Sequence, residues 1–439
     1  MTHRPSLPHI PRGRATTAQL GVTYPFQAGA SLGPRGVYLG EDVLAGGGAF
    51  CFDPFQAYRD GVITSPNMVV LGQLGSGKSA FVKTFLHRSV GLLGDRNGGH
   101  RRVVIADPKG EYGPLAVALG LDVLRLHPGG AVRLNPLDAD PAVGFASLEE
   151  IALRRTSLLI ALSGEIAGAA GRRVSALERS TIAWIVETLT VNSAGIMSPT
   201  LGDVVRLLEN PTEEIAARAG RTSRELSREV EHLRFELLQL LDGPLRGMFD
   251  GRSTVTIDWS GRGVVLDLSV VKDDPAALAI VMLAASGWLD SVLTAGASRD
   301  DGSVWYQVID EGWALLGSED RARNYQAKQK LARSYGVINI LVVHRISDLA
   351  AQADDGTATA KIGAGLLADT QTRVLFRQDG DQTRLARSAL QLTETEAALL
   401  PKLAVGRALW KVGNHSAVVQ HRVAAPEWRF ARTDDRMTA

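Results

Sequence analysis

The sequence has a single cysteine, Cys51, in 439 residues. One thiol excludes an internal disulfide and a metal site made of four cysteines, and it fits a reducing compartment. No stretch reaches about 18 consecutive apolar residues, so the sequence predicts no membrane-spanning helix. Residues 1–16 contain arginine and proline but no apolar segment, and we therefore expect no secretory signal.

Net charge is also nearly absent. The chain has 48 lysine and arginine residues against 47 aspartate and glutamate residues, a formal net charge of +1. No overall field therefore draws it toward nucleic acid, although local basic patches remain open. Its length exceeds that of one typical core, which predicts two packed units or one core with a large insertion.

The strongest pattern present is Gly-x-x-x-x-Gly-Lys-Ser at residues 72–79. It follows a short apolar run, 68–71, and precedes a segment, 80–90, with apolar residues at helical spacing. A strand, a glycine loop and a helix in this order distinguish a phosphate-binding loop from a chance glycine turn. Backbone N–H groups of such a loop and the helix N-terminus attract phosphate oxygens. We therefore expect the chain to bind a nucleoside triphosphate.

Two residues of this loop have separate expected roles. Lys78 should reach the β and γ phosphates, and the Ser79 hydroxyl should bind Mg²⁺. The full set of nucleotide-binding candidates in the loop is Gly72, Gly75, Ser76, Gly77, Lys78, Ser79 and Ala80.

Two adjacent acids, Asp310 and Glu311, follow a mainly apolar run at 304–309. Successive residues at a strand end point in different directions, so the two carboxylates can take different roles. We expect Asp310 to hold Mg²⁺ through water, and Glu311 to orient and polarise the water that attacks the γ phosphate. Many surface strands also end in acids, so this assignment depends on the phosphate loop upstream.

Two further strand ends carry polar residues. Asp107 opens the block Asp-Pro-Lys-Gly-Glu-Tyr at 107–112, at the end of a predicted strand. Ligands collect at strand ends in open parallel sheets, which makes Asp107 a nucleotide-binding candidate. A proline turn that closes the strand is the alternative. His344 follows the apolar strand 338–343, where it either senses the γ phosphate or faces solvent.

The pattern along the chain divides it into five predicted parts. These are a flexible tail with short strands (1–60), the first part of an ATPase core (61–144), a helical insertion (145–250), the second part of the core (251–425) and a C-terminal tail (426–439). In the insertion, Thr222 and Glu225 form a capping-box pattern, and an apolar stripe predicts one helix from there to Gly243. Outside it, strands alternate with helices, which predicts an α/β fold with a mainly parallel sheet and helices on both faces.

Taken in order, the motifs resemble those of the motor ATPases of type IV secretion and conjugation systems, in the HerA/FtsK branch of P-loop ATPases. The resemblance spans about residues 36–425 and points to the large VirB-type, TraG-like ATPase of actinobacterial conjugative elements. It implies a RecA-like P-loop core with an inserted all-helical domain, a hexameric ring, and hydrolysis of ATP at subunit interfaces. It rests on the phosphate loop, the block at 107–112, Asn135-Pro136-Leu137, Phe249-Asp250-Gly251, Asp267-Leu268-Ser269 and Asp310-Glu311.

Two site residues come from this resemblance. The family places an arginine that reaches the neighbouring subunit's γ phosphate just before the sensor strand, and Arg333 falls at that place; a solvated helix arginine is the alternative. The family usually has glutamine where this chain has His344, whose charge depends on pH. The family also has a substantial N-terminal domain, whereas residues 1–60 precede the core here. We therefore expect membrane docking to be shortened or supplied by a separate polypeptide.

The expected function is that of an ATP-hydrolysing motor of a type IV secretion or conjugative transfer system. As a cytoplasmic ring, held at the inner face of the cell membrane by membrane-embedded partners, it would power assembly or substrate transfer. A DNA-translocating ATPase of the HerA/FtsK kind, or a conjugative coupling ATPase, is the alternative. A nucleotide-gated scaffold is a third, but intact Lys78, Asp310 and Glu311 favour hydrolysis. The sequence contains no base-reading motif that we recognise, so a preference for ATP over GTP comes from the resemblance alone.

Overall fold

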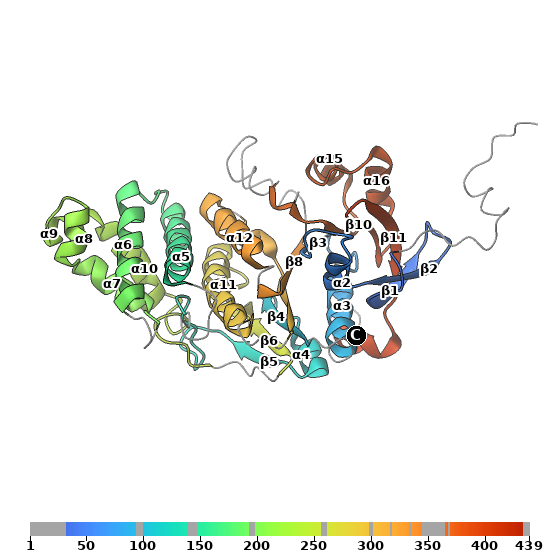
Figure 1. Ribbon diagram of the computed structural model, residues 1–439, viewed down its shortest axis with the longest axis horizontal. Helices are drawn as coiled ribbons and strands as arrows, with labels where there is room; N and C mark the ends of the chain where they lie inside the picture. The colour runs from blue at the N-terminus through green and yellow to red at the C-terminus, as the bar shows by residue number, and fades with distance from the viewer. Residues whose placement is uncertain are drawn as a thin grey trace, which may run out of the picture.

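A computed structural model of the chain describes residues 32–93, 100–138, 147–192, 198–255, 261–297, 302–316, 318–332, 335–344, 365–367 and 369–432. The strands, in chain order, are β1 (Val37–Asp42), β2 (Gly48–Phe52), β3 (Met68–Leu71), β4 (Arg101–Asp107), β5 (Asp122–Arg125), β6 (Gly263–Asp267), β7 (Val304–Ile309), β8 (Val337–Val343), β9 (Thr372–Leu375), β10 (Arg407–Val412) and β11 (His415–His421). They form one sheet in the order β2-β1-β11-β10-β9-β3-β8-β7-β4-β6-β5 (Figure 1).

From β9 to β5 in this order, neighbouring strands run parallel. The four strands β3, β4, β7 and β8 are buried along their whole length, and accordingly their sequences are largely continuous apolar runs. Because these strands are parallel, their carboxyl ends lie at one edge of the sheet. That edge carries the phosphate loop, Asp107, Asp310 and His344, which the sequence places at strand ends.

Helices cover both faces of the parallel half: α3 (Lys78–Leu92), α4 (Gly113–Leu119) and α17 (Trp428–Ala431) on one, α11 (Pro275–Ala297) and α12 (Glu319–Ala332) on the other. Successive side chains of β3 point to opposite faces of the sheet and pack against different helices. Met68 and Val70 pack in one core with Phe81 of α3. Val69 and Leu71 pack in a second core with α11 and the helical insertion. The predicted α/β architecture is therefore confirmed.

The insertion between β5 and β6 is helical, with no strand in its described residues, 147–192 and 198–255. Its helices are α5 (Leu148–Ala169), α6 (Ala176–Asn192), α7 (Leu201–Glu209), α8 (Glu213–Arg218), α9 (Ser223–Glu229) and α10 (Glu231–Asp242). The capping box of Thr222 and Glu225 is present at the start of α9. The single helix predicted from there is two helices, because Val230 (φ −103°, ψ 14°) leaves helical geometry. The apolar stripe continues across this break, so its periodicity does not reveal it.

The other end of the sheet is antiparallel: β10 pairs with β9 and β11, and β1 pairs with β11 and β2. Figure 1 shows β1 and β2 at the opposite end of the molecule from α6 to α10. The Trp410 ring of β10 lies 5.0 Å from the ring of Phe50 and 5.5 Å from that of Phe81. This packing ties the antiparallel strands to α3, the helix that begins in the phosphate loop. Three shorter helices belong to this end: α2 (Pro54–Arg59), α15 (Gly380–Ala389) and α16 (Glu394–Leu399).

Among the helices in the described part of the chain, we find none that is long and apolar enough to cross a bilayer.

Candidate nucleotide site

The phosphate loop joins β3 to α3 through glycines that its backbone requires. Gly75 (φ +71°) and Gly77 (φ +98°) lie in the left-handed region, which other residues rarely adopt. Gly72 is needed for space, because a Cβ there would lie 2.5 Å from the Cβ of Phe376. The glycine spacing of the motif is thus explained by the fold of the loop itself.

Lys78 begins α3 and is almost fully buried, with 3% of the residue exposed. Its Nζ lies 2.8 Å from Nδ1 of His344. Burial lowers the pKa of Lys78 to about 8, and the nearby carboxylate of Asp310 opposes this only in part. An ammonium whose charge is destabilised by burial gains when phosphate oxygens approach it. The side chain is therefore suited to binding a triphosphate.

Glu311 follows β7 in the left-handed conformation (φ 54°, ψ 43°), which is rare for a residue with a side chain. Its Oε1 lies 2.5 Å from Nζ of Lys109 and 2.7 Å from Nε2 of His344. Its Oε2 accepts a hydrogen bond from Nε1 of Trp313 at 2.5 Å. Burial raises the pKa of Glu311, but the hydrogen bonds and charges of His344 and Lys109 outweigh it and lower the pKa to about 2. Glu311 is therefore an ionised carboxylate that already holds several donors.

Asp310 has a different environment from its neighbour. It is 3% exposed, and its Oδ1 accepts a hydrogen bond from the backbone N–H of Glu311 at 3.0 Å. The Tyr112 hydroxyl donates to Oδ2 at 3.4 Å. Burial raises the pKa of Asp310, and the negative charge of Glu311 adds to the rise. The pKa values of the two acids thus shift in opposite directions, in line with the separate roles predicted for them.

The oxygen donors at this edge fit a magnesium ion that arrives with a nucleotide. Among the described residues, no group of three or more His, Cys, Asp or Glu side chains is placed to hold a metal alone. The Ser79 hydroxyl and the Asp310 carboxylate are hard oxygen ligands, the kind that Mg²⁺ combines with phosphate oxygens and water. The set suits Mg²⁺ bound together with a triphosphate.

Asp107 organises the turn that follows β4. Its Oδ1 accepts from the backbone N–H groups of Lys109, Gly110 and Glu111 at 3.2, 2.8 and 3.1 Å. Its Oδ2 accepts from the N–H of Tyr112 at 2.8 Å. The turn points Lys109 toward Glu311. Of the residues in the 107–112 block, Lys109 is therefore the one that contacts an acid at the end of another strand. We did not single out Lys109 from the sequence, although its place two residues beyond a strand end was a signal.

His344 lies at the centre of these residues, with 18% of its side chain exposed. Its Nδ1 faces Lys78, and its Nε2 faces Glu311 and, at 3.0 Å, Nζ of Lys109. A lysine ammonium has only donors, so Nδ1 accepts from Lys78, while Nε2 lies between a donor, the Lys109 ammonium, and an acceptor, the Glu311 carboxylate. We call Lys78, Lys109, Glu311 and His344 the strand-end cluster. One imidazole thus links the phosphate-loop lysine to the acid after β7.

Arg333 lies outside the described residues, which include α12 only as far as Ala332. Its role, and the domain boundaries given above, stay predictions.

A cleft of about 700 Å³ opens above the phosphate loop. Besides the loop residues, its walls include side chains from the 107–112 block, His344 and the C-terminal part of the chain. The residues lining it are Gln73, Leu74, Gly75, Ser76, Gly77, Lys78, Ser79, Ala80, Lys109, Glu111, His344, Val405, Trp428, Ala431 and Arg432. This volume is that of a small-molecule site, and it contains phosphate-binding chemistry.

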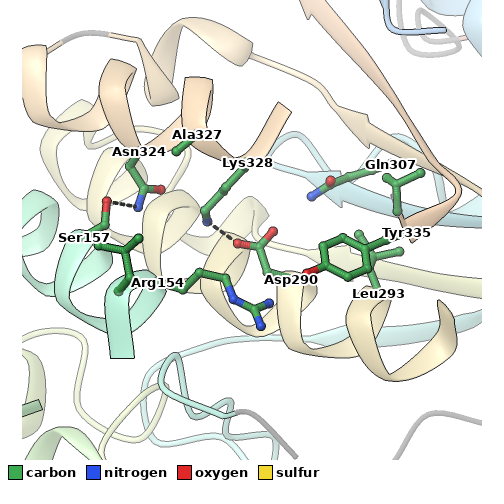
Figure 2. Close-up of a pocket in the computed structure, with 11 residues that line it drawn as sticks. Arg154, Ser157, Asp290, Leu293, Gln307, Asn324, Ala327, Lys328 and Tyr335 are labelled. Atoms are coloured by element: carbon green, nitrogen blue, oxygen red, sulfur yellow. Dashed lines mark hydrogen bonds and ion pairs between the residues drawn. The ribbon is translucent and has the colours of Figure 1, made fainter. Parts of the chain in front are cut away.

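Figure 2 shows a second cavity, of about 210 Å³, lined by residues of α5, α11 and α12 and of two strands. Lys328 and Asp290 face each other there, with Nζ 2.7 Å from Oδ2, and Asn324 donates to Ser157 at 3.1 Å. None of the predicted nucleotide-site residues lines this cavity. The candidate site is therefore the cleft at the phosphate loop.

Comparison with known families agrees with this site. Residues 62–283, just over half of the chain, match the family described as helicase HerA, central domain. The chain belongs to the HerA family. The matched region includes the phosphate loop, the 107–112 block and the helical insertion. Membership places this chain in a family of P-loop ATPases and confirms the branch that its motifs indicate.

Two solved structures share the fold of this HerA-family chain. VirB4 of Thermoanaerobacter pseudethanolicus is 19% identical, with a TM-score of 0.69 over 90% of this chain and 98% of that one. A bacterial conjugative coupling protein, TrwBdeltaN70, is 16% identical, with a TM-score of 0.51 over 80% of this chain and 83% of that one. Identities this low show the fold alone. No curated protein matches the chain.

Proposed function

We propose that this chain is the ATP-hydrolysing motor of a type IV secretion or conjugative transfer system. The observation that carries the proposal is the strand-end cluster, in which an ionised Glu311 is linked through one imidazole to the phosphate-loop lysine. The likeness to VirB4 over nearly the full length of both chains supports the choice of system.

The cluster suggests how nucleotide starts the reaction. Oε1 of Glu311 is shared between Lys109 and His344. A γ phosphate at the loop is a stronger anion for Lys109, so it competes with Glu311 for this donor. As Lys109 turns to phosphate, the carboxylate loses a cation, its pKa rises, and an oxygen becomes available to a water molecule. Binding thereby converts Glu311 into a better proton acceptor.

Hydrolysis then proceeds by in-line attack of this water on the γ phosphorus. Glu311 orients the water and accepts its proton, while the bond between the γ phosphorus and the β–γ bridging oxygen breaks and ADP leaves. Lys78 stabilises the negative charge that develops on the phosphate oxygens. Ser79 and Asp310 would hold Mg²⁺, which neutralises phosphate charge when bound.

We propose further that the motor works as a hexameric ring, with Arg333 reaching the neighbouring subunit's nucleotide. Membrane-embedded secretion or conjugation components would hold the cytoplasmic ring at the inner face of the cell membrane. The function would then be to power assembly or substrate transfer.

A DNA-translocating or coupling ATPase is the second candidate. It is favoured by the match to the helicase HerA central domain and by the fold shared with a conjugative coupling protein. In that case DNA would be the partner and the substrate.

Steady-state ATP hydrolysis, measured across protein concentration with and without single- and double-stranded DNA, tests both. Turnover that rises steeply with protein concentration and ignores DNA supports the secretion motor. Turnover stimulated by DNA would contradict the secretion motor and support the DNA-translocating or coupling ATPase. Absence of nucleotide binding in the intact chain would contradict both.

A further inference from the structure

One wall of the phosphate-loop cleft is formed by residues from the C-terminal part of the chain. Val405 precedes β10, and Trp428 begins α17. Both are apolar side chains that line the cleft, yet Val405 is 60% exposed and Trp428 is 42% exposed. Neither has a part in the phosphate chemistry described above.

Trp428 is held in place by anchors on both sides of its short helix. Just before α17, Glu427 accepts from Arg88 of α3, at 2.8 Å to Oε1 and 2.5 Å to Oε2. Within α17, Phe430 is buried, and its ring lies 4.6 Å from the ring of His87. Arg88 and His87 belong to the helix that begins in the phosphate loop. Trp428 therefore has a fixed position relative to that loop.

Val405 is fixed to the loop as well. The adjacent Gly406 donates its backbone N–H to the carbonyl of Ser76 at 2.9 Å. Gly406 also packs so closely that a Cβ on Gly77 would lie 2.9 Å from its nitrogen. The two exposed apolar side chains are thus held on the same rigid frame as the phosphate site.

We propose that Trp428 stacks on the base of the bound nucleotide, with Val405 packing beside it. This rests on the proposed function, because it requires a triphosphate at the loop. Arg432 is placed to support the stack, since its guanidinium lies 6.0 Å from the centroid of the Trp428 ring and lines the same cleft. Every base has a π face, so stacking favours a nucleotide over inorganic triphosphate but discriminates weakly between adenine and guanine.

The test compares three ligands, ATP, GTP and inorganic tripolyphosphate, with Mg²⁺, by calorimetry on the full chain. For Trp428→Ala we expect ATP and GTP to bind roughly 10- to 100-fold more weakly, with unchanged affinity for tripolyphosphate. Trp428→Phe should retain most of the affinity. Phe235→Ala is the matched control, because Phe235 is 50% exposed on α10 and also has an arginine, Arg234, 4.4 Å from its ring. It should bind all three ligands as the wild type does.

The outcomes separate this inference from the proposed function. Equal weakening of tripolyphosphate and ATP in Trp428→Ala would show that Trp428 acts only by supporting the loop, and it would overturn the stacking proposal. Unchanged ATP affinity, with turnover lost only at low protein concentration, would overturn it in favour of a contact between subunits. If the wild type binds neither ATP nor tripolyphosphate, the proposed function itself fails.

Discussion

Two partly buried sets of charged residues in this molecule compensate their charges in different ways. In the cavity beside the insertion, Nζ of Lys328 lies 2.7 Å from Oδ2 of Asp290, and Lys328 also donates to Ser286 at 2.8 Å. In the strand-end cluster, one carboxylate oxygen of Glu311 faces both Lys109 and His344. The first arrangement gives a cation one carboxylate and holds helices together. In the second arrangement, two groups share one carboxylate oxygen. Either group can move away while the other still compensates the carboxylate, so a ligand can rearrange the cluster.

The largest expected effect comes from removing the acid of the cluster. Glu311→Gln keeps the size of the side chain but cannot accept a proton, so we expect turnover to fall by roughly 10³-fold while ATP affinity is retained. Single-turnover hydrolysis and calorimetry measure the two quantities.

Lys78→Ala is the contrasting variant, because it should lose nucleotide binding as well. If Glu311→Gln and Lys78→Ala lose binding equally, the assignment of Glu311 is wrong.

The second prediction concerns the pair in the cavity. Lys328→Met removes the ammonium that faces Asp290, and we expect about 2 kcal/mol lower free energy of unfolding. This is less than the ~3–5 kcal/mol of a fully buried pair, because both side chains keep 16–18% exposure. Urea unfolding with and without the substitution measures it.

The double variant with Asp290→Asn should recover part of the loss. Nucleotide affinity should stay at the wild-type value, and a fall in affinity would mean that this cavity is coupled to the site.

A smaller effect is expected when the cluster loses one of its shared donors. Lys109→Met should reduce turnover roughly tenfold, because a cation for the γ phosphate is missing. The variant also raises the pKa of Glu311 above its value of about 2, since the charge of Lys109 is one of the causes that lower it. The acid limb of the pH profile of kcat/KM, which reports the free enzyme, should therefore move to higher pH than in the wild type. An unmoved acid limb would show that Lys109 does not control Glu311.

The smallest effect is a pH dependence of affinity. The pKa of Lys78 is about 8, so its ammonium is largely lost between pH 7 and pH 9. Since phosphate binds the charged form, ATP affinity should fall roughly fourfold from pH 7 to pH 8.5. Lys109 is one of the charges that lower this pKa, so Lys109→Met should shift the decline to higher pH. Calorimetry of ATP binding to the wild type and to Lys109→Met across this pH range measures both effects.

The comparison also shows what the sequence can reveal. The phosphate loop, Asp310 and the strand that precedes each were predictable because local spacing encodes them. His344 was predictable as a position, but its contacts with Lys78 and Glu311 depend on β3, β8 and β7 lying side by side in the sheet. Lys109 and Trp428 were missed for the same reason, since no local pattern tells which cation or aromatic a distant turn will place at the site. The break at Val230 was missed because side-chain periodicity says little about one backbone angle.

The anchor between Arg88 and Glu427 joins residues 339 positions apart, on the phosphate-loop helix and beside α17. On a ribosome, which releases the chain from its N-terminus, the loop is made early and its cleft is finished late. Contacts of this range are formed slowly, because a long stretch of chain must be ordered before they close. The nascent protein therefore cannot assemble a complete nucleotide site until synthesis has passed the last strand. Partly made chains are kept from forming the complete nucleotide cleft by the order in which the chain emerges.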